Sequence, residues 1–295
     1  MRIAITGSSG LIGSALFVHL RAAGHRVVTV SRAPTADVRW DPAERSLDVG
    51  ALDGVDAIVH LAGEPIAGRW TKKRKQRILE SRVVGTELLA ETVRAMTDPP
   101  SVVLSGSAIG FYGDTGETLV DETSQPGDDF LSGVAASWEN AAEPIADVCR
   151  LVTLRTGIVL SDSGGALVPV VRASKLFVGG PMGRGFQFWS WISIVDQVRA
   201  IEHLLTADVS GPVNLTAPQP VTQREFMNVL GKVLRRPSVM PAPAFAIQAI
   251  LGEMADALIL TSARVEPRKL LDSGFEFAHP SLEGAFRVVL GLVDR

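Results

Sequence analysis

The sequence predicts an α/β protein with a doubly wound parallel sheet, followed by a smaller C-terminal region. Over the first 160 residues, short apolar segments rich in β-branched residues alternate with helical segments, as in sheets whose strands are joined by crossover helices. A glycine-rich turn joins the first strand to the first helix. After about residue 160, glycine- and proline-rich loops, an aromatic cluster and short helical patterns replace the alternation. We therefore expect a sheet domain over 1–160 and a substrate region over 161–295, with some interleaving of the chain.

The first strand, helix and second strand form one βαβ unit. Residues 1–5 are a short apolar run, and Leu11 to Ala23 carries apolar residues at helical spacing, with Gly24 as the stop signal. Residues 26–30 (RVVTV) then form a second β-rich segment. A glycine motif in this strand–turn–helix context has a specific structural meaning.

The turn between them reads Thr6-Gly-Ser-Ser-Gly-Leu-Ile-Gly13. Gly7 permits the tight turn, Gly10 lets the backbone approach a pyrophosphate, and Gly13 lets the helix pack closely. The free N–H groups and positive dipole of the helix N-terminus favour phosphate binding. The turn therefore predicts a dinucleotide site, although a plain connecting turn is the alternative. The expected cofactor contacts here are Gly7, Ser9, Gly10, Leu11, Ile12 and Gly13.

The second strand ends in Ser31 and Arg32. An NAD site usually places a carboxylate at this position to bind the ribose 2′-hydroxyl. A hydroxyl and a guanidinium instead offer donors to a 2′-phosphate. The cofactor predicted is therefore NADP(H); the alternative is a solvated arginine.

Two further strands are expected at the same edge of the sheet. Residues 38–40 form a short strand whose end, Trp40-Asp41, would lie beside the adenine of a bound cofactor. Residues 57–63 form a buried strand that ends in Leu61, Ala62 and Gly63, where small residues leave room for the cofactor.

The remaining sheet elements follow in order. A basic segment, 69–77, leads into a helix that runs to Met96, and a strand from residue 101 leads toward Ser107. A polar, acidic loop over 114–130 precedes a helix that contains Trp138 and Glu139, and residues 151–160 form another strand.

The C-terminal part contains a glycine loop at 163–165, an apolar helix ending near Phe177, and an aromatic cluster. Asp196 is expected to cap a helix that runs to Leu205. The tail over 212–295 carries several prolines and short helical patterns. The cluster consists of Phe186, Phe188, Trp189 and Trp191.

Composition excludes several classes of protein. Hydrophobic residues make up 46% and charged residues 21% of the chain, which is ordinary for a globular enzyme. The net charge of −3 gives no basic field for nucleic acid or an anionic membrane. The single cysteine, Cys149, is expected to be a buried reduced thiol, and the five histidines lack metal-ligand spacing, so no metal site is expected. No membrane span or targeting segment is visible, so a cytoplasmic protein is expected.

These motifs resemble the extended short-chain dehydrogenase/reductase superfamily. Residues 6–13 match its TGxxGxxG turn, residues 60–63 its strand-four motif, and Ser107 its active-site serine strand. Residues 82–86 resemble its NVxGT helix start, with Arg82 in place of asparagine, and residues 183–196 resemble its GxGxQxRDFxxVxD segment. The resemblance implies a Rossmann-like fold, with Arg82 facing the cofactor phosphates.

More narrowly, the chain is similar over its whole length to a subgroup labelled "epimerase family protein", which carries a C-terminal extension. Its marks are Trp138-Glu139 and the segments 154–160, 188–192, 211–218, 264–267 and 270–277. The resemblance implies an NADP(H)-dependent oxidoreductase or epimerase, although the label fixes no activity. It also implies cofactor contacts at Arg155 and Val159, the latter through its backbone to the nicotinamide amide.

Two departures from the superfamily pattern affect the chemistry. The general acid/base is normally a tyrosine four residues ahead of a lysine, but residues 131–139 contain neither, and the only tyrosine is Tyr112. The arginine that holds a nucleotide-sugar's phosphates is replaced by Trp189. An ordinary nucleotide-sugar is therefore not expected, and an apolar or aromatic ligand is favoured.

Three residues are catalytic candidates: Ser107, Tyr112 and Glu139. Ser107 would orient a carbonyl or hydroxyl, Tyr112 would donate a proton if Arg155 lowered its pKa, and Glu139 would act as a base if desolvated. Each also has a structural alternative: satisfying the backbone, packing, or an exposed helix face. The expected partner is a small molecule, and a homodimer stays open. A non-catalytic NADPH-binding protein that acts through a protein partner is the alternative function.

Overall fold

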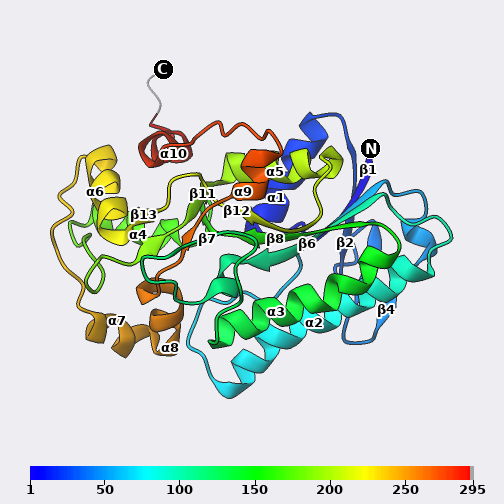
Figure 1. Ribbon diagram of the computed structural model, residues 1–295, viewed down its shortest axis with the longest axis horizontal. Coiled ribbons are helices and arrows are strands. Elements are labelled where there is room, and N and C mark those ends of the chain that lie inside the picture. The colour runs from blue at the N-terminus through cyan, green and yellow to red at the C-terminus, as the bar shows by residue number, and fades with distance from the viewer. Residues whose placement is uncertain (293–295) are drawn as a thin grey trace.

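An eight-stranded sheet forms the centre of the molecule (Figure 1), in a computed structural model that describes residues 1–292. Its strand order is β12-β8-β6-β5-β1-β2-β3-β4, and every neighbouring pair is parallel except β3 and β4. The strands are β1 (Arg2–Thr6), β2 (Arg26–Ser31), β3 (Val38–Asp41), β4 (Ser46–Leu47), β5 (Ala57–His60), β6 (Val102–Ala108), β8 (Arg150–Thr156) and β12 (Gly211–Leu215).

Helices cover both faces of this sheet (Figure 1). One face packs against α1 (Leu11–Ala22), α5 (Ile194–Thr206) and α9 (Arg268–Asp272), and the other against α2 (Lys72–Ala95) and α3 (Phe130–Ala142). The core of the sheet domain has one apolar layer on each face of the sheet, because alternate side chains of a strand point to opposite faces. The predicted doubly wound, Rossmann-like architecture is confirmed.

Local sequence signals explain where the two long helices of the second face begin. Thr71 accepts a hydrogen bond from the backbone of Arg74 and so caps α2, which ends four residues before Pro99-Pro100. Asp129 caps α3 in the same way, through the backbone N–H of Ser132. Short 3₁₀ turns fill the connections: η1 (Gly50–Leu52), η2 (Ile109–Tyr112) and η3 (Glu143–Asp147).

Beyond residue 157 the chain builds a second apolar core at the left end of Figure 1. Three small sheets belong to this part of the molecule or join it to the first: β9 with β11, β10 with β13, and β7 with β14. Its strands are β7 (Leu119–Val120), β9 (Ile158–Leu160), β10 (Phe188–Trp189), β11 (Trp191–Ser193), β13 (Val221–Thr222) and β14 (Arg264–Val265). Its helices are α4 (Leu167–Lys175), α6 (Gln223–Leu234), α7 (Ala244–Leu251), α8 (Glu253–Ala255), the π-helical η4 (Asp256–Leu260) and α10 (Leu282–Val289).

The expected boundary at residue 160 does not separate the sheet domain from the rest of the chain, because α5 and β12 follow this boundary and pack on or join the large sheet. The expected strand over 151–160 is also interrupted at Gly157, where the chain leaves β8 and pairs as β9 with β11. A Cβ at Gly157 would lie 2.7 Å from the Ser190 carbonyl oxygen, so this crossing needs a glycine.

The expectation that Asp196 caps α5 is wrong. The N-cap is Ser193, whose hydroxyl accepts from the backbone N–H of Asp196 at 3.0 Å. Asp196 lies in the first turn, fully buried, and its carboxylate accepts from the backbone N–H groups of Ala278 and His279. It therefore holds the C-terminal tail against the sheet domain.

Within residues 1–292, no helix is long and apolar enough to cross a membrane. The same residues contain no cluster of three or more histidine, cysteine or acidic side chains placed to hold a metal ion. Cys149 is half-buried, and burial raises the pKa of its thiol to about 11, so it is a poor nucleophile.

Candidate functional site

The carboxyl ends of β1, β2, β5, β6, β8 and β12 meet at one edge of the sheet, where ligands bind in open α/β folds. The glycine turn follows β1. Gly7 has a φ of +69°, and a Cβ there would lie 2.8 Å from the backbone of Leu61. A Cβ at Gly13 would lie 2.2 Å from the Gly7 carbonyl oxygen. Gly13 therefore lets α1 approach the turn itself, rather than the sheet.

The N-terminus of α1 is open to an anion. Its N-cap, Gly10, has no side chain to bind the first-turn N–H groups, and that turn has no acidic residue. The loop after β9 covers the side of this turn, since a Cβ at Gly165 would lie 3.0 Å from Leu11 Cδ2 and 3.7 Å from the Val159 carbonyl oxygen. The Val159 carbonyl oxygen therefore lies close to this loop, and its contact with the nicotinamide stays a prediction.

At the end of β2, Ser31 and Arg32 occupy the expected position. Ser31 Oγ accepts from the backbone N–H of Ala33 at 3.1 Å. Arg32 is exposed, and none of the ion pairs formed among residues 1–292 involves it. The guanidinium is therefore available to a 2′-phosphate.

Trp40 does not lie where the sequence suggested. Its side chain is buried in the core, edge-on to His60 with ring centroids 5.6 Å apart, and it packs against Gly85 of α2. The ring is therefore not exposed to an adenine, and Asp41 is the residue that ends β3.

His60, the first residue of the strand-four motif, is fully buried at this edge. Its ring nitrogens contact Thr6 Oγ1 at 2.7 Å and Thr86 Oγ1 at 3.0 Å. Burial lowers the pKa of His60 to about 4, so the ring is neutral at physiological pH. Its role is to tie β1, β5 and α2 together beneath the glycine turn; a histidine at the end of an apolar strand was the signal.

Arg82 lies between the β5 end and α3. Its Nη1 donates to the carbonyl oxygens of Glu64 at 3.1 Å and Ile78 at 3.0 Å, and its guanidinium lies 5.0 Å from the Trp138 ring centroid. Gly63 packs directly on it. Burial lowers the pKa of Arg82 to about 10, so it still carries a positive charge at neutral pH, beside the expected cofactor path.

Ser107, Glu139 and Arg155 form a compact cluster at the ends of β6 and β8. Ser107 and Arg155 are register partners, and Ser107 Oγ donates to Glu139 Oε1 at 2.6 Å. Arg155 donates to both carboxylate oxygens of Glu139, with two contacts of 2.8 Å. Glu139 is only 13% exposed, so it is neither an exposed helix residue nor an unpaired base. Arg155 thus pairs with both oxygens of Glu139, and a contact of Arg155 with the cofactor stays a prediction.

Tyr112 is hydrogen-bonded to this cluster through Arg155. Its hydroxyl donates to Asn214 Oδ1 at 2.7 Å and accepts from Arg155 Nη1 at 3.0 Å. Burial raises the pKa of Tyr112 to about 12, more than the neighbouring Arg155 lowers it. The expectation that Arg155 would bring this pKa into a working range is therefore wrong, and Tyr112 is a structural member of the network.

Two members of the network had no clear sequence signal. Asn214 lies on β12, and its side chain also donates to the Glu266 carbonyl oxygen at 2.9 Å. Glu122 comes from the acidic loop and is buried, accepting from the backbone N–H groups of Asn214 and Lys269. Burial raises the pKa of its carboxyl group.

The aromatic residues expected to stack on a ligand are mostly core residues. Trp191 is fully buried, and Trp189 is buried with its indole N–H directed at the Ile259 carbonyl oxygen at 3.3 Å. Phe188 is half-buried beneath Arg264, and Phe186 is exposed beneath Arg224. The replacement of arginine by Trp189 thus fills the second core and gives no support to an aromatic-stacked ligand.

Comparison with known proteins identifies the family. The model of the NAD dependent epimerase/dehydratase family matches residues 3–135, and a domain of unknown function, DUF1731, matches residues 242–289. An epimerase family protein of Mycobacterium bovis is 40% identical, over 95% of this chain and 94% of its own. The chain belongs to this epimerase family.

Two solved structures extend the comparison to three dimensions. The human epimerase family protein SDR39U1, crystallised with NADPH, is 34% identical, with a TM-score of 0.92 over 99% of both chains. A nucleoside-diphosphate sugar epimerase from Corynebacterium glutamicum is 35% identical, with a TM-score of 0.81 over all of this chain and 59% of its own. The resemblance to an extended short-chain dehydrogenase/reductase with a C-terminal extension is confirmed.

Proposed function

We propose that this member of the epimerase family is an NADP(H)-dependent oxidoreductase that acts on a small hydroxyl compound or the corresponding carbonyl. The glycine turn fits the cofactor, because side chains at Gly7 and Gly13 would collide with backbone and the N-terminus of α1 has no side-chain cap. The exposed Arg32 supplies a cation for a 2′-phosphate. The human relative that contains NADPH supports the same cofactor.

The observation that carries the proposal is the hydrogen bond from Ser107 to Glu139. Because Ser107 uses its proton in this bond, its lone pairs are free to accept from a substrate hydroxyl. Bound NADP(H) accepts or supplies the hydride. When the substrate hydroxyl is oxidised, its proton passes to Ser107 Oγ while the serine proton passes to Glu139.

The direction of this hydrogen bond refines the expectation that Ser107 polarises a carbonyl. Ser107 donates to Glu139 Oε1, and the same carboxylate accepts two hydrogen bonds from Arg155, so the serine is placed to accept from a substrate rather than to donate to it. Alcohol oxidation is therefore the direction that this arrangement assists.

A second candidate function is a cofactor-binding protein without turnover. The specific observation in its favour is that Tyr112, the only phenol, has its hydroxyl committed to Asn214 and Arg155 and its pKa raised to about 12. Without a tyrosine–lysine pair, general acid/base help of about 10²–10⁴-fold depends on Ser107 and Glu139 alone. If these two residues supply no such help, the protein would bind NADPH without turnover and act through a protein partner.

Cofactor choice is tested by calorimetric titration with NADPH and NADH. NADPH should bind about tenfold to a hundredfold more tightly, because a charge-assisted pair is worth roughly 1.5–3 kcal/mol. Arg32→Ala should remove this preference, whereas Arg26→Ala, at the opposite end of the same strand, should not. Equal affinities of the unaltered protein for the two cofactors would reject the NADP(H) assignment.

Turnover is tested with a panel of small apolar alcohols with NADP⁺, their carbonyls with NADPH, and a set of UDP-sugars. Slow turnover that falls further in Ser107→Ala and Glu139→Gln, with cofactor affinity kept, supports the oxidoreductase. Brisk epimerisation of a UDP-sugar would contradict the substrate class. NADPH binding without turnover of any compound would favour the non-catalytic candidate.

A further inference from the structure

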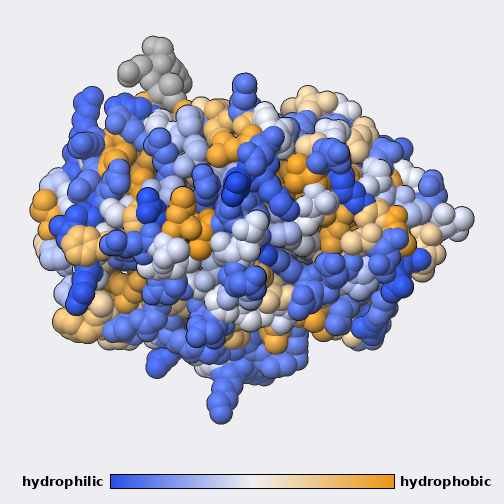
Figure 2. All heavy atoms as spheres, in the orientation of Figure 1, coloured by the Kyte–Doolittle hydropathy of each residue, from blue (hydrophilic) through white to orange (hydrophobic). Residues whose placement is uncertain are grey.

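Exposed apolar side chains concentrate at one end of the molecule, around α6 and α7 at the left of Figure 1. We call the segments 176–186 and 239–250 the apolar tip. Figure 2 shows apolar side chains among hydrophilic ones at this end of the surface. The large exposed apolar residues of the tip are Leu176, Phe177, Val178, Phe186, Val239, Met240, Phe245 and Ile250.

The two segments of the tip are neighbours in space. The backbone of Met240 donates to the Gly179 carbonyl oxygen at 3.2 Å, and that of Ala242 to the Pro181 carbonyl oxygen at 2.8 Å. The apolar helix α7 follows directly, and none of its eight residues is buried. Phe245 is 73% and Ile250 is 78% exposed. A helix of this composition that stays exposed indicates a surface that contacts something apolar.

Positive charge surrounds these side chains. Between residues 172 and 184, and between 224 and 250, there are seven cations and one acid, Glu225, although the whole chain has a net charge of −3. All seven are exposed, and none takes part in the ion pairs formed among residues 1–292. The cations are Arg172, Lys175, Arg184, Arg224, Lys232, Arg235 and Arg236.

Cations and apolar rings alternate closely on this surface. The guanidinium of Arg236 lies 4.9 Å from the Phe177 ring centroid, and that of Arg224 lies 5.3 Å from the ring of Phe186. Of the acids on the neighbouring α8 and η4, Glu253 pairs with Lys75, and Asp256 accepts from the amide of Gln248 on α7. With Asp256 and Glu225 counted against the seven cations, the tip keeps an excess of positive charge.

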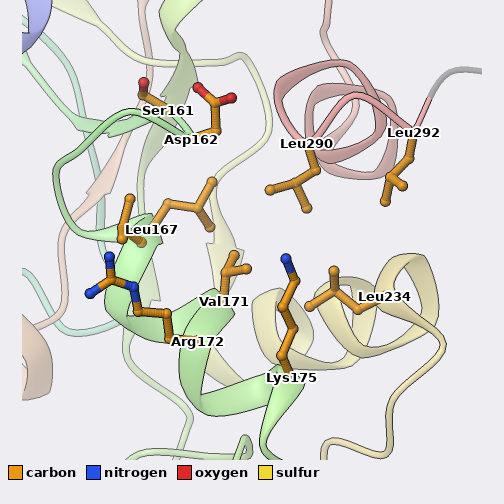
Figure 3. Close-up of a pocket in the computed structure, with 10 residues that line it drawn as sticks. Ser161, Asp162, Leu167, Val171, Arg172, Lys175, Leu234, Leu290 and Leu292 are labelled. Atoms are coloured by element: carbon orange, nitrogen blue, oxygen red, sulfur yellow. The ribbon is translucent and has the colours of Figure 1, made fainter.

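A pocket of about 370 Å³ lies between α4, α6 and α10, and like the tip it is lined by both charged and apolar side chains (Figure 3). Lys175 extends across the pocket toward Leu290, and its apolar walls include Val171 and Leu234. The pocket adjoins the tip along the chain, since Lys175 in its wall is followed by Leu176 of the tip. Two cations, Arg172 and Lys175, and one acid, Asp162, line the pocket, so an anionic group with an apolar chain would have to lie on the side of the two cations.

We propose that the apolar tip binds the surface of an anionic lipid membrane. Aromatic and aliphatic side chains would enter the boundary between headgroups and acyl chains, while arginine and lysine contact lipid phosphates. A second copy of the chain fits poorly, because a two-fold contact would place seven cations against seven. We expected no membrane contact because the net charge of the whole chain is −3. That net value does not show that seven cations are concentrated at the tip.

The test uses the purified full-length protein in a flotation assay with phosphatidylcholine vesicles, with and without phosphatidylglycerol. We expect the protein to float with the anionic vesicles, and high salt to weaken this binding. Each cation near an anionic surface contributes about fivefold in affinity, so Arg235→Glu/Arg236→Glu should weaken binding by thirtyfold or more, at order-of-magnitude precision. Phe245→Ser should also weaken it.

Matched controls carry the same changes elsewhere. Arg21→Glu/Arg26→Glu alters two exposed arginines, one near the end of α1 and one at the start of β2. Val18→Ser alters an exposed apolar residue of α1. These variants should bind the anionic vesicles like the unaltered protein. All altered positions are exposed, and thermal melts verify that each variant is folded.

Three results would overturn the proposal. The first is no binding to either kind of vesicle. The second is equal loss of binding in the tip variants and in their matched controls. The third is concentration-dependent dimerisation that Phe245→Ser abolishes, which would assign the tip to a second copy. Neither the proposal nor its test depends on turnover or on cofactor binding.

Discussion

The pair formed by Glu139 and Arg155 offers a quantitative test of the candidate site. The side chains are 13% and 5% exposed, and two hydrogen bonds of 2.8 Å join them. Removing one partner of a buried ion pair typically costs about 3–5 kcal/mol, because the other charge is left without compensation. We therefore expect Arg155→Met and Glu139→Gln each to lower the free energy of unfolding by about 3 kcal/mol.

The double variant separates the pair from its surroundings. Replacing both partners removes the uncompensated charge, so Glu139→Gln/Arg155→Met should cost less than the sum of the single changes, by about 2 kcal/mol. Urea unfolding followed by tryptophan fluorescence measures all four proteins. The control is the exposed pair Glu283 and Arg287 on α10, whose side chains are 54% and 48% exposed. The coupling energy between Glu283→Gln and Arg287→Met should be no more than about 0.5 kcal/mol. A coupling energy at Glu139 and Arg155 as small as that of the control would refute this reasoning.

Two further predictions concern single residues. Because Tyr112 is the only tyrosine, tyrosinate absorbance during a pH titration reports this residue alone, with an expected midpoint near 12 in the folded protein and near 10.0 in urea. The pKa of Tyr112 is higher in the folded protein than in the unfolded chain. The stability that the neutral phenol contributes is therefore complete below pH 10 and is lost as the pH rises toward 12. A folded midpoint at or below 10 would contradict this prediction. Gly13→Ala should abolish NADPH binding in calorimetry and lower stability by about 1–3 kcal/mol, because its Cβ would lie 2.2 Å from the Gly7 carbonyl oxygen. As a control, Gly133→Ala in α3, whose Cβ meets nothing within 4 Å, should raise the free energy of unfolding by up to about 1 kcal/mol. Normal NADPH binding by Gly13→Ala would contradict the prediction, because it would show that the glycine turn can move to make room for the Cβ.

The sheet and the glycine turn could be predicted because their signals are local. Periodicity marks each strand and helix over a few residues, and parallel pairing then brings the carboxyl ends of the strands to one edge. The same signals predicted the strands that carry Ser107 and Arg155, which the structure pairs directly. They could not show that Arg155 turns toward Glu139, since that contact depends on where α3 lies over the sheet.

The wrong expectations concern the direction of side chains and their long-range partners. A tryptophan has the same signal in the sequence whether it lines a site or fills a core, and Trp40 and Trp189 do the latter. Tyr112 is held by Asn214, 102 residues away, and burial rather than Arg155 sets its pKa. Neither the partner nor the degree of burial can be derived from nearby residues.

The position of β12 in the sheet affects how the chain matures during synthesis. Until residues 211–215 emerge from the ribosome, β8 remains the outer strand, with unpaired backbone groups and apolar residues such as Leu151, Val152 and Leu154. An open edge of this kind is a template for pairing with other chains. A nascent or proteolysed chain that ends near residue 160 would therefore contain the whole glycine turn and still be prone to aggregate. The C-terminal half protects the nucleotide-binding half by supplying its last strand.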